Sequence, residues 1–69
     1  MSIDRVTLGK KFKATREKLG LSQQATADTA GLHVSHYAKV ERGERKAGLE
    51  TLEKISKALK LKFPDVLQK

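Results

Sequence analysis

The sequence predicts an all-α fold of five short helices, and two observations support this. Apolar residues recur at steps of three and four along most of the chain, whereas the alternation typical of strands is not sustained. Glycines stand where the first three of these segments end, at Gly20, Gly31 and Gly43. No internal repeat or linker divides the 69 residues, so we expect a single domain over residues 1–69.

The first helix is expected from Leu8 to Leu19, with Thr7 as its N-cap and Gly20 after its end. Gly9 lies inside this helix and costs it about 1 kcal/mol relative to alanine. The apolar face of the helix is predicted to contain Leu8, Phe12 and Leu19.

The second helix is expected from Gln23 to Ala30, with Ser22 as N-cap, and the third from Val34 to Arg42, before Gly43. The inner face of the second helix carries small residues, which permit a close crossing with a neighbouring helix. A fourth amphipathic helix is predicted over residues 49–59. A short fifth helix is predicted over residues 64–68, because a proline fits a first helical turn.

The third predicted helix has two different faces. At 100° per residue, Tyr37 and Val40 point one way, and Ser35, Lys39 and Arg42 point the other way. One face is therefore apolar, and the opposite face is polar and basic.

The amino-acid composition limits which partners, cross-links and metal sites are expected for this protein. Fifteen Lys and Arg against eight Asp and Glu give a net charge of +7, which attracts polyanions, although a basic surface also serves solubility. Cysteine is absent, so no disulfide or thiolate zinc site is expected. No signal-peptide run or membrane span is seen, and we expect a cytoplasmic protein with no membrane partner.

Residues 22–41 encode a capped helix, a glycine turn and a second helix with a basic outer face, which is the pattern of a helix-turn-helix unit. The chain resembles the lambda-repressor-like, or Xre/Cro type, helix-turn-helix family over about residues 8–67. The residues that carry the resemblance are Leu21-Ser22-Gln23, Ala27, Gly31, Val40-Glu41-Arg42-Gly43 and Leu49-Glu50-Thr51-Leu52. The resemblance implies a five-helix DNA-binding domain.

The resemblance also implies roles for individual residues. Positions facing base edges are Val34, Ser35 and Lys39, although Val34 is also read as packing against the rim of the domain. Positions contacting phosphate are Gln23, His33, Arg42, Arg45 and Lys46, with His33 at the N-cap of the recognition helix. A structural ion pair is implied between Arg16 and Glu41.

Tyr37 stands where the family usually has Ile. We therefore expect a buried ring whose hydroxyl reaches a hydrogen-bond partner or the DNA backbone.

No catalytic constellation is found, and an enzyme is not expected. Ser22 has no histidine base in a plausible arrangement, and its capping role explains it. His33 and His36 are spaced i, i+3, but no third metal ligand is evident, so we expect no metal, cofactor or small-molecule ligand.

The end of the chain is apolar for a terminus. These residues either close the core of the domain or form a homodimer interface, which we favour, across Leu61, Phe63, Val66 and Leu67. A dimer would bind a palindromic operator with half-sites about 10–10.5 base pairs apart.

The expected function is therefore sequence-specific binding of double-stranded DNA by a transcriptional regulator, most simply a repressor. One alternative is an antitoxin-type subunit that binds a protein partner and regulates its own synthesis through DNA. Another is a non-specific polyanion binder, which would show little preference between selected and random sequences.

Overall fold

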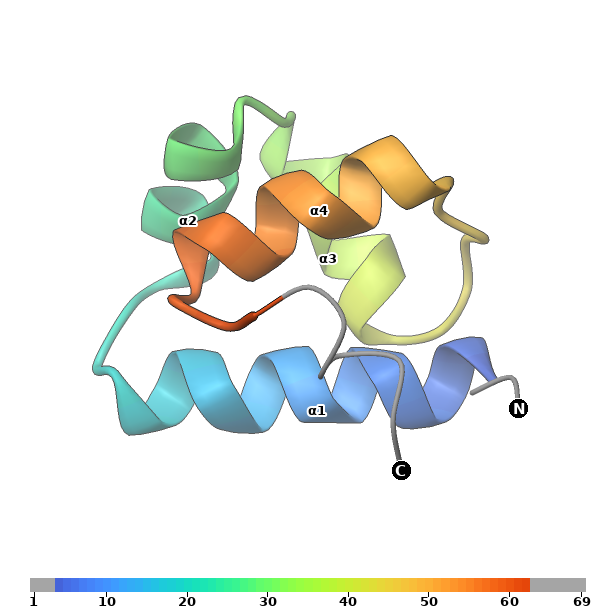
Figure 1. Cartoon of the computed structure of the whole chain (residues 1–69), viewed down its shortest axis with the longest axis horizontal. Coiled ribbons are helices and arrows are strands. Elements are labelled where there is room, and N and C mark those ends of the chain that lie inside the picture. The colour runs from blue at the N-terminus through green and yellow to red at the C-terminus, as the bar shows by residue number, and fades with distance from the viewer. Residues whose placement is uncertain (1–3, 63–69) are drawn as a thin grey trace.

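The computed structural model describes residues 4–62, and within this range the chain is all-helical. Four helices are present there, not five, and the fifth expected helix, over residues 64–68, lies outside the described residues. The helices are α1 (Arg5–Lys18), α2 (Gln23–Ala30), α3 (Val34–Glu41) and α4 (Leu49–Ala58). Helix α1 runs along one edge of the molecule, and the other three helices lie on one side of it (Figure 1).

The helices surround one apolar core. Helix α2 packs against both α3 and α4, and α1 packs against α3. The inner face predicted for α3 is buried at Tyr37 and Val40, and the small residues Ala27 and Ala30 of α2 are buried as expected. Leu19 was expected on the apolar face of α1 but is 41% exposed, because it is the C-cap that follows the last helical turn.

The predicted start of α1 is wrong. The helix begins at Arg5, and its N-cap is Asp4, not Thr7. The carboxylate of Asp4 accepts hydrogen bonds from the Thr7 backbone N–H at 2.8 Å and from the Thr7 hydroxyl at 3.0 Å. Both residue types cap helices, but the carboxylate also complements the positive end of the helix dipole, so the helix gains another turn.

The other caps follow the sequence closely. Ser22 caps α2 by accepting the Ala25 N–H at 3.0 Å, as predicted. His33 is the N-cap of α3, also as predicted, and its Nδ1 accepts the Ser35 N–H at 3.2 Å. Helices α3 and α4 each end one residue earlier than expected, because the expected last residue is the C-cap in both cases.

Gly9 marks the closest approach between α1 and α3. A Cβ atom at this position would clash with the carbonyl oxygen of Glu41 and would lie 2.6 Å from that of Val40. The helix therefore accepts the low helix propensity of glycine because a side chain would push α1 away from the end of α3.

We expect Gly9→Ala to destabilise the fold by about 1–3 kcal/mol, since the clash involves backbone atoms that cannot move aside. Urea denaturation would measure the loss. Gly48→Ala is the control, because a Cβ there meets nothing within 4 Å. Helix propensity alone predicts a gain of about 1 kcal/mol for Gly9→Ala, and such a gain would refute the close approach.

Candidate nucleic-acid interface

A buried ion pair joins α1 to the end of α3. Arg16 of α1 donates from Nε to Glu41 Oε2 at 2.6 Å and from Nη2 to Oε1 at 3.3 Å, so the expected pair is present. Arg16 also donates from Nη1 to the Leu21 carbonyl oxygen at 2.8 Å. The side chains of Arg16 and Glu41 are only 11% and 2% exposed.

Gln23, the first residue of α2, completes this network. Its Nε2 donates to Glu41 Oε1 at 2.9 Å, so the residue expected to contact phosphate is engaged inside the protein. Burial raises the pKa of Glu41, but the donor groups of Arg16, Tyr37 and Gln23 around the carboxylate outweigh this effect and the pKa is lowered overall. The charged carboxylate thus holds the end of α3 to both α1 and α2.

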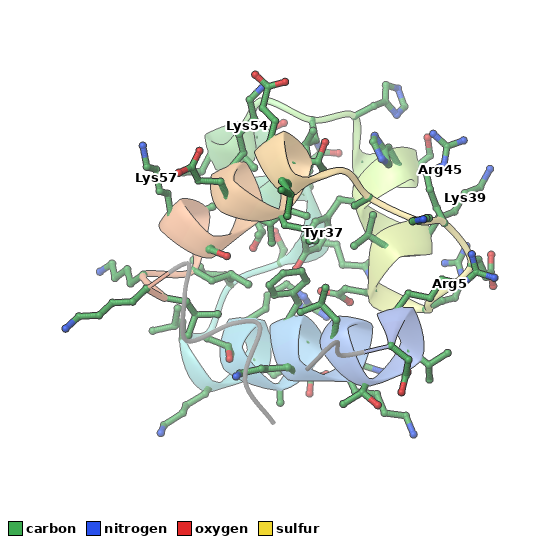
Figure 2. The ribbon with its side chains drawn as sticks, turned by 45° about the vertical axis from the view of Figure 1, so that its right-hand side comes forward. Arg5, Tyr37, Lys39, Arg45, Lys54 and Lys57 are labelled. Atoms are coloured by element: carbon green, nitrogen blue, oxygen red, sulfur yellow. The ribbon has the colours of Figure 1, made fainter. Side chains whose placement is uncertain are left out.

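Tyr37 departs from the expectation. Its ring is fully buried as predicted, but its hydroxyl is buried near the Glu41 carboxylate without forming a hydrogen bond of standard geometry. Burial raises the pKa of Tyr37 far above its usual value, so the phenol stays neutral. The ring therefore anchors the inner face of α3 by packing, and its hydroxyl is not available to DNA (Figure 2).

The first turn of α3 is organised by His33. The Ser35 hydroxyl lies 2.8 Å from His33 Nδ1, and both residues are exposed. Val34 is half-buried and packs against the core, which favours the rim position over a fully exposed one. Ser35 and the N-cap residue His33 therefore present polar groups to solvent at the start of α3.

Exposed cations continue this face beyond α3. Lys39, Arg45 and Lys46 are exposed, and Figure 2 shows Lys39, Arg45 and Arg5 on the same side of the molecule. Lys57 lies on the other side in that view, and Lys54 lies at the top. Arg5 and Arg45 thus lie on the side of the molecule to which Lys39 of α3 points.

Arg5 is a residue that the sequence reasoning missed. A hollow of about 280 Å³ separates α1 from the segment before α4, and three cations line it above an apolar floor. These cations are Arg5, Arg45 and Lys46. Asp4 is the sequence feature that could have identified Arg5, because an N-cap at Asp4 places Arg5 in the first turn of α1.

Arg42 is exposed, as expected of a residue that contacts phosphate, but it is paired within the protein. Its guanidinium binds the carboxylate of Glu44 through two hydrogen bonds, of 2.8 and 3.1 Å. This pair was not predicted from the sequence, where Glu44 was given no role.

Other classes of site were sought among residues 4–62. No group of three or more His, Cys, Asp or Glu side chains is arranged there to hold a metal ion, and His33 and His36 belong to no such group. Within the same residues, no helix has both the length and the apolar character that crossing a membrane requires.

Arg16→Ala should destabilise the protein by about 3–5 kcal/mol, because it leaves the carboxylate of Glu41 buried without its charged partner. Tyr37→Phe is the contrasting variant. It removes a hydroxyl that forms no hydrogen bond of standard geometry, so its effect should stay within about 1 kcal/mol and can be stabilising. Chemical denaturation measures both. Equal losses for the two variants would contradict this assignment of the buried network.

Comparison with known proteins agrees with this geometry. A family model described as helix-turn-helix matches residues 12–66. The chain is 38% identical over 64 residues to control protein C.BamHI of Bacillus amyloliquefaciens, covering 91% of this chain and 79% of that protein. It is 37% identical over 60 residues to control protein C.SmaI of Serratia marcescens, covering 87% and 71%.

Solved structures show the same likeness. The restriction-modification controller protein C.AhdI from Aeromonas hydrophila superposes with a TM-score of 0.86 at 32% identity, covering 90% of this chain and 94% of that chain. The clp gene regulator ClgR from C. glutamicum shares the fold, with a TM-score of 0.85 at 23% identity, covering 96% and 86%. The chain therefore belongs to the helix-turn-helix family.

Proposed function

We propose that this protein is a transcriptional regulator that binds double-stranded DNA by placing α3 in the major groove. The observation that carries the proposal is the two-sided character of α3. Tyr37 and Val40 are buried on one side, whereas Ser35 and Lys39 are exposed on the other side. Membership of the helix-turn-helix family supports this use of the exposed side.

Base contacts are assigned to the exposed side of α3. Lys39 donates to guanine O6 and N7, and Ser35 bonds to either kind of base edge once its hydroxyl turns away from His33. Val34 would contact a thymine methyl from the rim of the helix, with the part of its side chain that stays exposed.

Phosphate contacts are assigned around this helix, where long cations hold the DNA without reading its sequence. The residues predicted from the sequence are Gln23, His33, Arg42, Arg45 and Lys46. We add Arg5, because it lines the same hollow as Arg45 and Lys46. The side-chain amide of Gln23 is bonded to Glu41, so it would have to be shared with a phosphate. The backbone N–H groups at the start of α2 would also attract that phosphate.

The names of the relatives support a role in the control of gene expression. Two of them are named control proteins, and one similar structure is a restriction-modification controller protein. We infer that this chain regulates promoters, in the simplest case as a repressor that occupies its operator. No catalytic role is proposed.

We also propose that the protein binds a palindromic operator as a homodimer. One recognition helix buries too little DNA surface to select a single site among the many competing sites of a genome. The proposed interface contains Leu61, Phe63, Val66 and Leu67. Leu61 is half-buried and packs against the core of its own domain, so it would add only its remaining surface, and the other three residues lie outside the described range.

Lys39→Ala should lower affinity for a selected DNA site and relax its sequence preference, because a good base contact contributes about 1–3 kcal/mol of discrimination. Arg45→Ala and Arg5→Ala should weaken selected and random DNA alike, and each should reduce the slope of log K against log salt by about 1. Fluorescence anisotropy titrations over a range of salt concentrations measure both effects.

Lys57→Ala is the matched control for these titrations. It removes one cation from α4, on the other side in Figure 2, and should leave the salt slope almost unchanged. If Arg45 changed the sequence preference and Lys39 did not, the proposed orientation on DNA would be wrong. If all sequences bound equally to the unchanged protein, it would be a non-specific polyanion binder.

The dimer is tested separately by sedimentation of the complex with a selected site. Two chains per site are expected, and Phe63→Glu with Leu67→Glu should reduce operator affinity by disrupting the interface. A complex containing one chain, with affinity unchanged in the double variant, would remove the dimer from the mechanism.

A further inference from the structure

Glu44 is held in place beside the last turn of α3. Gly43 has a φ of 73°, and its N–H donates to the Val40 carbonyl oxygen at 3.1 Å. The Glu44 N–H donates to the Lys39 carbonyl oxygen at 2.9 Å. These two bonds form a Schellman motif, which fixes the backbone of Glu44 to the end of the helix.

The side chain of Glu44 is bound to Arg42 in the geometry of a fork. Glu44 Oε2 accepts from Arg42 Nε at 2.8 Å, and Oε1 accepts from Nη2 at 3.1 Å. Arg42 lowers the pKa of Glu44, and the charge of Lys39 contributes to the same effect. A charged carboxylate therefore lies close to two of the cations that are assigned to DNA contact.

This carboxylate resembles a DNA phosphate in what it offers to Arg42. Carboxylate and phosphate both present two oxygens to the same edge of a guanidinium. While Glu44 is bound, that edge of Arg42 is occupied and its charge is neutralised. The Arg42 and Glu44 side chains are 52% and 55% exposed, and such exposed pairs are weak enough to be displaced.

We propose that Glu44 competes with DNA for Arg42. Its carboxylate occupies the edge of the Arg42 guanidinium, and a backbone phosphate must displace this carboxylate in order to bind there. The inference rests on the proposed DNA-binding function and concerns the strength of that binding. It makes Glu44 a residue that limits affinity for DNA, at a position where the sequence alone shows only a charged loop.

The test is a double-mutant cycle in the full chain, using Glu44→Gln, Arg42→Ala and the combined variant on random and selected duplexes. Glu44→Gln should raise affinity about three- to tenfold at low salt, because the phosphate that binds Arg42 no longer has to displace a carboxylate. Arg42→Ala should cost less affinity when Glu44 is present, because Glu44 competes for the Arg42 guanidinium, than it costs in the Glu44→Gln background.

The matched control is Glu53→Gln, which removes the same charge from an exposed position on α4. It should raise affinity much less than Glu44→Gln. Thermal unfolding should show that all variants remain folded, because the Arg42–Glu44 pair is at the surface.

Three results would overturn the inference while leaving DNA binding intact. Equal gains from Glu44→Gln and Glu53→Gln would show an effect of net charge alone. Weaker binding of Glu44→Gln to all DNA, with a large loss for Arg42→Ala alone, would show that Glu44 positions Arg42 for contact. Weaker binding of Glu44→Gln to the selected site only would make Glu44 a base-contacting residue. If the unchanged protein bound no duplex, both the proposed function and this inference would fall.

Discussion

The buried ion pair between Arg16 and Glu41 is the interaction on which the arrangement of the helices most depends. It links α1 to the last turn of α3, and Gln23 brings the start of α2 to the same carboxylate. A buried charge is tolerated only when its partners are close and well oriented, and this requirement fixes how the three helices meet. The orientation of α3 relative to α2 follows from it.

Packing adds a second constraint at the same place. Gly9 lets α1 approach the carbonyl groups at the end of α3, and this close approach is compatible with the short ion pair. The buried ring of Tyr37 fills the space behind α3 without using its hydroxyl. The inner side of the helix is thus fully committed to the fold, which leaves the outer side free for a partner.

The outer side of α3 combines cations that attract DNA with one carboxylate that weakens this attraction. Cations from α1, α3 and the segment before α4 gather on one face, as expected for a surface that meets the DNA backbone. Within this face Glu44 is held by the backbone of α3 and neutralises Arg42. A regulator must leave wrong sites as readily as it finds them, and an acid among its cations moderates the attraction that all sequences share.

Features that arise from contacts close along the chain can be recognised in the residues themselves. Helix periodicity, the caps at Ser22 and His33 and the glycine stops involve residues within a few positions of one another, so they could be predicted. The family resemblance supplied the pairing of Arg16 with Glu41. Three features are visible only in the folded chain. Arg5 lies with Arg45 at one hollow, Gly9 meets the end of α3, and the Tyr37 hydroxyl is buried without a hydrogen bond of standard geometry. These outcomes depend on how distant helices approach one another, and a pattern of residue types along the chain does not encode such distances.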